Sequence, residues 1–306
     1  MITRPATAAV SVLRARTPQR LGTLVGLLFP ALAVVTMLFG GGLALGMVQS
    51  LGHLPAAGMS SLTLDHFARV LADPDFFKSL GLTLYLSLTS TLIAAAISVA
   101  AALAFNALAD RSRIVQFIFQ IPLTVPHLVI AVAVVFMLAP SGLLARVLHA
   151  AGFISSATEF PLLVNDPWGV GILTAYVWKE VPFITLMILA VLRAGGAELL
   201  DVGRTLKAGR WQRFRYITLP MIFPSLGAAS LIVFAYTFGA FEVPYLLGQT
   251  YPMMLPVWAY KAYSDVDLLS RPEGIAAGLV IAAVVTAAVA LTQGLTQAAR
   301  RRGALL

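Results

Sequence analysis

The sequence predicts an all-α integral membrane protein with six transmembrane helices, and three observations support this fold class. Hydrophobic residues make up 59% of the 306 residues and charged residues only 11%, whereas a soluble domain carries about 25% charged residues. Six apolar runs are long enough to cross about 30 Å of hydrocarbon, which takes about 20 helical residues. The runs are apolar on all sides and lack a period of two, so they indicate helices and not the strands of a barrel.

The expected spans are separated by connections of 5 to 33 residues. They cover residues 21–48, 80–108, 114–139, 168–192, 221–241 and 275–295. The first run follows several arginines and is 28 residues long. A cleavable signal peptide has an apolar core of only about 7 to 15 residues, so we interpret this run as a retained span.

The three connections on the side opposite the termini are expected to carry structure of their own. In the first, Thr63 or Asp65 could cap a short helix at residues 64–71. The second predicts a short amphipathic helix near residues 143–150. The third, residues 242–273, is rich in tyrosine and proline. Its rings serve either as interfacial anchors or as a ligand platform, and both interpretations stay open.

The distribution of basic residues places both termini in the cytoplasm. With connections assigned alternately to two sides, the side of the termini carries 15 Lys and Arg residues, and the other side carries five against nine acids. Short cytoplasmic loops are enriched in Lys and Arg, so the basic side faces the cytoplasm. The net charge of +8 thus reports topology and does not indicate nucleic-acid binding. We expect a cytoplasmic segment at residues 1–20, one membrane domain at residues 21–298 and a basic cytoplasmic tail at residues 299–306.

The cytoplasmic segment between the fourth and fifth spans, residues 193–220, has the most informative pattern. Leu199, Val202 and Leu206 are three and four residues apart, which puts them on one side of a short helix. Gly209 follows as a helix breaker. We expect two short helices joined by a turn.

The second of these helices would bring Trp211 and Phe214 together. Three arginines surround the pair in sequence: Arg210, Arg213 and Arg215. Buried aromatic rings and arginines dominate the affinity of protein interfaces, which favours a docking surface. A basic interfacial helix held by anionic lipid would need the same composition, so both interpretations remain open at this point.

The segment resembles the cytoplasmic loop of inner-membrane permeases of binding-protein-dependent ABC importers. In that loop Glu-Ala-Ala is followed by three residues, Gly, nine residues and Ile-x-Leu-Pro. The corresponding residues here are Asp201, Val202 and Gly203, then Lys207, then Ile217, Leu219 and Pro220. The likeness extends through Arg204, Ala208, Trp211, Arg213 and Phe214, and the six-span topology suits the family over roughly residues 60–298. Lys207 departs from the Gly of the pattern, so either Gly209 makes the turn or the coupling geometry differs.

The resemblance implies a type I ABC importer permease fold in the bacterial inner membrane, with a loop that docks on a separate ATPase. The implied ATPase-coupling residues are Asp201, Arg204, Leu206, Lys207, Ala208, Gly209, Trp211, Arg213, Phe214, Ile217, Leu219 and Pro220. The implied partners are an ATPase dimer that binds ATP and Mg²⁺, a second identical or homologous permease, an extracytoplasmic solute-binding protein and the lipid bilayer. Closure of the ATPase dimer would tilt the paired permeases between inward-facing and outward-facing states.

The sequence gives no sign of an enzyme or of a cofactor on this chain. It contains no Gly-x-x-x-x-Gly-Lys-Ser/Thr run to hold phosphates, so ATP hydrolysis is expected on another polypeptide. Cysteine is absent, and the four histidines lack metal-ligand spacing. We therefore expect no catalytic residue and no metal site.

Polar residues inside apolar spans are candidates for the substrate path, because burying them in hydrocarbon costs several kcal/mol by some estimates. Lys179 and Glu180 lie about 16 Å into the fourth span, and neighbouring helical residues point about 100° apart. Each could line a wet cavity, or serve an interhelical ion pair or a kink at Pro182. The full set of candidates is Asn106, Lys179, Glu180, Glu242 and Tyr245. Glu242 could equally be a solvated helix end.

These observations together predict the permease subunit of an ATP-driven, solute-binding-protein-dependent importer. Acids in the path suit a cation, and the surrounding sequence is most similar to spermidine and putrescine permeases. Ferric iron, thiamine, phosphonate and molybdate are alternative substrates, because their permeases are closely similar. An ion-coupled secondary transporter or a membrane scaffold that transports nothing are the alternatives of other classes.

Overall fold

The computed structural model describes residues 19–108 and 113–301, and this part of the chain confirms the all-α fold with six candidate spans. The helices long and apolar enough to cross a membrane are Gly22–Ser50, Pro74–Ala107, His127–Ala150, Val170–Gly195, Arg210–Gly239 and Leu268–Gly294. Residues 1–18 and 302–306 lie outside the described residues, and with them most of the expected N-terminal segment and of the basic tail.

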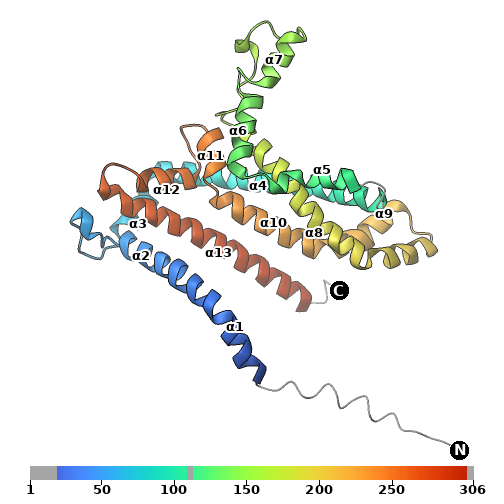
Figure 1. Ribbon diagram of the computed structural model, residues 1–306, viewed down its shortest axis with the longest axis horizontal. Coiled ribbons are helices and arrows are strands. Elements are labelled where there is room, and N and C mark those ends of the chain that lie inside the picture. The colour runs from blue at the N-terminus through green and yellow to red at the C-terminus, as the bar shows by residue number, and fades with distance from the viewer. Residues whose placement is uncertain (1–18, 109–112, 302–306) are drawn as a thin grey trace, which may run out of the picture.

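Thirteen α-helices follow one another in the described residues (Figure 1). They are α1 (Gln19–Val35), α2 (Gly41–Ser50), α3 (Asp65–Ala72), α4 (Pro74–Leu108), α5 (Arg113–Thr124), α6 (His127–Leu138), α7 (Leu143–Ala150), α8 (Val170–Thr205), α9 (Arg210–Arg213), α10 (Leu219–Gly239), α11 (Glu242–Leu247), α12 (Leu255–Tyr263) and α13 (Arg271–Arg301). Short π-helical segments lie at Thr36–Gly40 and Phe214–Thr218, and 3₁₀ turns at Pro55–Ala57, Ala157–Glu159 and Leu268–Ser270. The expected short helices α3 and α7 are both present.

The third expected span, residues 114–139, is not one continuous helix. It breaks into α5 and α6 at Val125 and Pro126. Proline disfavours a helical conformation for the residue before it and has no N–H to donate, so the chain changes direction there. In Figure 1, α5 lies along the body, while α6 turns away from it and carries α7 outward.

Two further boundaries differ from the predicted ones. Helix α4 starts at Pro74 instead of residue 80, with proline in the first turn, where its missing N–H costs nothing. Helix α8 continues to Thr205 instead of ending at residue 192. The expected first short helix of the cytoplasmic segment is therefore the end of α8.

Helices α4 and α8 form the centre of the bundle and run in the same direction. The Tyr85 hydroxyl donates to the Trp168 carbonyl at 3.4 Å, and the Ser98 hydroxyl donates to the Val181 carbonyl at 2.9 Å. Both contacts join residues 83 apart in sequence, so the two helices keep a constant register. Buried residues of α10 and α11 complete two apolar clusters around this pair.

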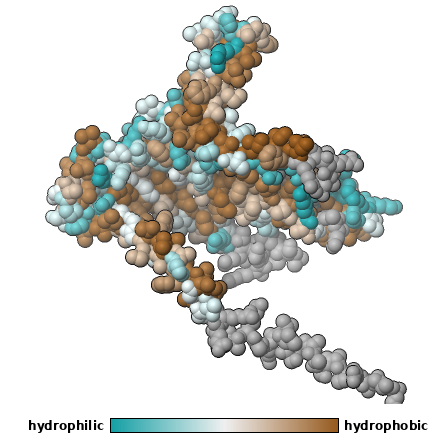
Figure 2. Space-filling view, in the orientation of Figure 1, coloured by the Kyte–Doolittle hydropathy of each residue, from teal (hydrophilic) through white to brown (hydrophobic). Residues whose placement is uncertain are grey.

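Many large apolar side chains outside these clusters are exposed. They include Leu27, Met37 and Phe39 on the first span and Phe117 on α5. Figure 2 shows a strongly hydrophobic strip over α5 and a hydrophilic tip at the end of the body that carries α9. In a membrane the apolar side chains face lipid or another membrane protein, where exposure carries no hydrophobic cost.

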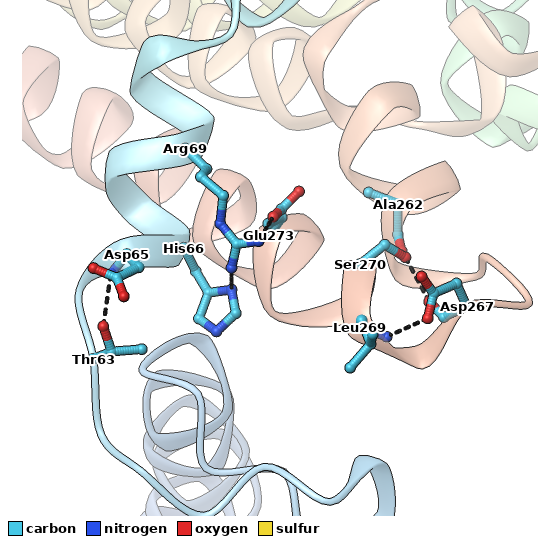
Figure 3. A network of polar contacts seen from close by, with 9 residues as sticks. All are labelled: Thr63, Asp65, His66, Arg69, Ala262, Asp267, Leu269, Ser270 and Glu273. Atoms are coloured by element: carbon cyan, nitrogen blue, oxygen red, sulfur yellow. Dashed lines mark hydrogen bonds and ion pairs between the residues drawn. The ribbon is translucent and has the colours of Figure 1, made fainter.

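At the opposite end of the body, α3 packs against α13 through a polar network (Figure 3). Arg69 donates from Nη2 to His66 Nδ1 at 2.8 Å, and its Nη1 lies 3.2 Å from Glu273 Oε1. His66 itself is buried. Arg69 has no acceptor atom, so the Nδ1 atom of His66 must be unprotonated to make this contact.

Acidification is expected to loosen the contact between α3 and α13. Burial, and then the Arg69 guanidinium, lower the pKa of His66 below its ordinary value of 6.5, although Glu273 and Asp65 oppose this. The folded state therefore binds fewer protons than the unfolded state, and the contact keeps its full stability above pH 6.5 and loses it below. Amide exchange in α3, corrected for its intrinsic pH dependence, should show more opening at pH 5.5 than at pH 7.5. The variant His66→Gln should remove this pH dependence, and a dependence that persists in it would contradict the assignment.

Candidate coupling loop and translocation site

The end of α8 forms the first limb of the coupling loop, defined as residues 193–220. The helix ends in a Schellman motif, in which the Ala208 N–H donates to the Gly203 carbonyl at 3.0 Å and the Lys207 N–H donates to the Arg204 carbonyl at 2.9 Å. Lys207 takes the left-handed conformation that this motif requires, with φ of 56°. For a residue with a Cβ this conformation costs about 1–2 kcal/mol.

Gly209 does not make the turn, contrary to one of the two expectations. Its φ of −63° and ψ of 165° are extended, and it precedes α9 as the N-cap residue. Its N–H donates to the Gln212 side-chain oxygen at 2.8 Å, which satisfies one of the free donors at the helix start. The bend is therefore at Lys207, the position where the resembling loops have glycine.

Trp211 and Phe214 lie together, as the spacing predicts, with ring centroids 5.5 Å apart. Phe214 is half-buried, whereas Trp211 is 71% exposed. Two more large apolar residues on the same loop, Leu206 and Tyr216, are each 76% exposed. The loop thus presents an uncovered surface of aromatic and aliphatic side chains from both of its limbs.

The second limb of the loop packs against the first at Gly203, a contact that sequence reasoning missed. Gly203 is buried, and a Cβ on it would lie 2.7 Å from Ile217 Cδ1 and 3.2 Å from Arg213 Cγ. The glycine therefore allows the limbs to approach closely. Arg213 is half-buried in this contact and is not a free rim residue.

The other residues of the predicted ATPase contact are exposed or half-buried. Asp201 and Arg204 are exposed and form an ion pair with each other at 2.6 Å. Ala208 and Leu219 are half-buried, and Pro220 is exposed in the first turn of α10. The structure brings both limbs into one compact loop at the tip of the body (Figure 1).

The Lys179 side chain binds backbone carbonyls at the break in the third span. Its ammonium donates to the Pro122 carbonyl at 3.2 Å and also to the Val125 carbonyl. These are the carbonyls left free where α5 ends, and a cation at a helix C-terminus is favourable. The kink that Lys179 supports is therefore in the third span and not at Pro182.

Glu180 points elsewhere, as expected for the next residue of a helix. It is 6% exposed, and neither carboxylate oxygen has a hydrogen-bond partner among the described residues. The Tyr176 hydroxyl, one turn earlier on the same face, is also buried without a partner in this part of the structure. Two such polar groups in one place are costly unless something else satisfies them.

Acidic and aromatic residues of α10 and α11 lie near this pair. Tyr236 and Glu242 interact electrostatically with Tyr176, and Glu180 interacts with both tyrosines. Glu242 is exposed at the start of α11. Beside it, Phe241, Tyr245 and Tyr260 form a cluster with ring centroids 4.4 to 6.2 Å apart. We call Tyr176, Glu180, Tyr236, Glu242 and Tyr245 the midspan site, after the position of Glu180; Glu242 and Tyr245 lie beyond Gly239, where the fifth span ends.

Asn106 is not part of the midspan site. By the constant register of α4 and α8 it lies level with Leu189. That is nine residues, or about 14 Å, beyond Glu180 towards the coupling loop. Tyr176 and Tyr236 are the residues that sequence reasoning missed, since tyrosine in an apolar span gives no signal of its own.

A family model described as the inner membrane component of binding-protein-dependent transport systems matches residues 93–302, which include both the coupling loop and the midspan site. The chain belongs to this family. It is therefore a multi-pass membrane protein and the permease component of a binding-protein-dependent ABC importer.

Individual relatives agree with this assignment. The permease is 25% identical over 176 residues to the molybdenum transport system permease protein ModB of Azotobacter vinelandii, covering 56% of this chain and 74% of ModB. A bacterial ABC transporter that imports the acidic polysaccharide alginate has a chain with a TM-score of 0.76 at 22% identity, covering 91% of this chain and 96% of that one. A bacterial alginate ABC transporter in complex with an alginate pentasaccharide-bound periplasmic protein matches with a TM-score of 0.74 at 23% identity, covering 92% and 96%. The structural likeness establishes the type I importer permease fold.

Proposed function

We propose that the permease is driven by a separate cytoplasmic ATPase that docks on the coupling loop. The observation that carries this proposal is the uncovered surface of Trp211, Leu206 and Tyr216 at the tip of the loop. The apolar run of α8 ends before Arg193, and Thr205 is twelve residues beyond Arg193. This distance is about 18 Å along the helix axis, whereas the headgroup layer is about 5–8 Å thick. A soluble protein therefore explains the surface better than lipid does.

The same proposal includes two more partners and an alternating-access cycle. A second permease, identical or homologous, would close the path, and an extracytoplasmic binding protein would deliver the solute to the outer face. The family description and the alginate transporter with its periplasmic protein support the binding protein. Closure of the ATPase dimer would then pull the coupling loops together and tilt the helices around the midspan site.

For the cargo we propose a small cation, with polyamines as the best-fitting class. Relatives are named for molybdenum and for alginate, so family membership does not determine the cargo. The ammonium of Lys179 donates to backbone carbonyls, which leaves Glu180 and Glu242 as the acidic groups of the midspan site. An ammonium group would donate to the unpartnered carboxylate, and the exposed rings of Tyr236 and Tyr245 suit a cation as well.

The test is reconstitution of the permease in vesicles with a candidate ATPase, second permease and binding protein. Binding protein loaded with spermidine or putrescine is expected to stimulate ATP hydrolysis and uptake. Uptake without ATP would indicate an ion-coupled transporter instead. A rate of ATP hydrolysis that changes with neither the binding protein nor its cargo would contradict the importer mechanism. Stimulation by molybdate-loaded protein alone would contradict the cation.

Replacing Glu180 with glutamine should lower spermidine uptake about 10- to 100-fold, because a hydrogen bond to a charged group contributes about 1.5–3 kcal/mol. Gln has the same size, so folding should persist. The control Asp65→Asn removes an exposed carboxylate at the outer face and should leave uptake unchanged. Equal uptake by Glu180→Gln and the unmodified permease would exclude Glu180 from the path.

A further inference from the structure

Lys207 combines a strained backbone with a charge that has no ion-pair partner in the described part of the chain. Its φ of 56° lies in the region that favours glycine. The ion pairs found among the described residues involve Arg69, Lys78 and Arg204, and none of them includes Lys207. The hydrogen bonds that define the turn use backbone atoms only. Glycine would therefore make the same turn at a lower cost, and the lysine ammonium forms no ion pair among the described residues.

The surroundings of Lys207 leave its charge available to a partner. The acid nearest to Lys207 in sequence, Asp201, is already paired with Arg204. Lys207 is exposed at the turn between α8 and α9, and the exposed residues Leu206 and Trp211 lie on either side of it in sequence. Lys207 thus stands within the surface that the ATPase is proposed to cover, where Arg210 and Arg215 are exposed as well, and of these three cations it alone has a left-handed backbone.

We propose that Lys207 forms an ion pair with an acidic side chain of the docked ATPase and helps to determine which ATPase the loop accepts. The inference rests on the proposed docking of the coupling loop. In the complex the ion pair offsets the strain of the turn. In the free permease the strain has no compensation. The charge of Lys207 also penalises any ATPase that lacks the complementary acid, because it would be covered there without a partner.

The experiment compares variants of full-length permease in nanodiscs of zwitterionic lipid and measures the Kd for the candidate ATPase over a range of salt concentrations. Lys207→Gly and Lys207→Asn keep the left-handed turn and remove the charge. Both should bind about two- to fivefold more weakly at low salt, as expected for one ion pair, and their Kd should depend less on salt. Lys207→Arg should bind like the unmodified permease. The control Lys261→Gln removes a lysine from the opposite face and should change neither quantity.

The free permease provides a second measurement. Lys207→Gly should raise its thermal unfolding temperature, because the strain of the turn is relieved, even though the same variant binds more weakly. Higher stability with weaker binding separates a partner contact from a merely structural role.

The outcomes also separate this inference from the docking proposal. If Trp211→Ala weakens binding while Lys207→Asn binds like the unmodified permease at every salt concentration, docking stands and the ion pair is refuted. If neither variant changes binding, docking itself fails. The same measurement in nanodiscs with anionic lipid tests a contact with headgroups. A charge effect that occurs only with anionic lipid would assign Lys207 to headgroups and overturn the ion pair.

Discussion

Replacing Trp211 and Phe214 with alanine is expected to release the ATPase from the permease. The two rings stack 5.5 Å apart at the tip of the coupling loop, and Trp211 is largely exposed. Aromatic residues that fill a partner's pocket typically contribute 2 kcal/mol or more, so each substitution should weaken binding about 30-fold. Co-purification of the ATPase and stimulation of its hydrolysis by the permease are the measurements.

Two variants keep this test independent of folding. Trp211→Ala alone removes only an exposed ring, whereas Phe214 is half-buried and its loss could also disturb the loop. Trp168→Ala is the matched control, because Trp168 has the same 71% exposure as Trp211 but lies just before the first residue of α8, at the opposite end of that helix. ATPase retention by Trp211→Ala at the level of Trp168→Ala would exclude the tip as the docking surface.

Replacing Lys179 with methionine is expected to destabilise the broken third span. The variant keeps the length of the side chain but removes both hydrogen bonds to the Pro122 and Val125 carbonyls. Hydrogen bonds of charged groups contribute about 1.5–3 kcal/mol each, so the total loss should be at least 3 kcal/mol. The unfolding temperature in detergent should fall, and amides near residues 122–130 should exchange faster.

Lys179→Arg and Lys261→Met complete the comparison. Arginine can still donate to the free carbonyls and should recover most of the stability. Lys261→Met removes an exposed lysine of α12 and should have no effect on unfolding. If Lys179→Met unfolds at the same temperature as Lys261→Met, the break does not depend on Lys179. Transport by Lys179→Met that is lost without any change in stability would instead favour a direct role in the path.

The sequence predicts the architecture well because its strongest signal, the length of apolar runs, is local. Five of the six expected spans correspond to helices with shifted ends. The third differs because Pro126 breaks it, and proline also occurs inside continuous membrane helices, as Pro182 does in α8. Sequence alone does not distinguish these two cases. The difference lies in tertiary contacts, since here Lys179 is present to bind the freed carbonyls.

The coupling loop was predictable in part, because some of its contacts are local in sequence. The pairing of Trp211 with Phe214 follows from helical spacing within one short segment. The left-handed turn at Lys207 contradicts the local preference for glycine, and Gly209 two residues later was the more obvious candidate. The midspan site depends on how α8, α10 and α11 pack, so spacing along the chain does not show that Tyr176 and Tyr236 join Glu180 and Glu242.

Helix α8 connects the midspan site to the coupling loop, because the same unbroken helix carries Glu180 and Arg204. These residues are 24 positions apart, or about 36 Å along the axis, so a tilt of about 5° at one end displaces the other by roughly 3 Å. Pro182 weakens the helix within one turn of Glu180, and bending concentrates at such a point. A force applied at the coupling-loop end of α8 would therefore bend the helix beside Glu180. This bend would change the orientation of the Glu180 carboxylate without any relay of side chains.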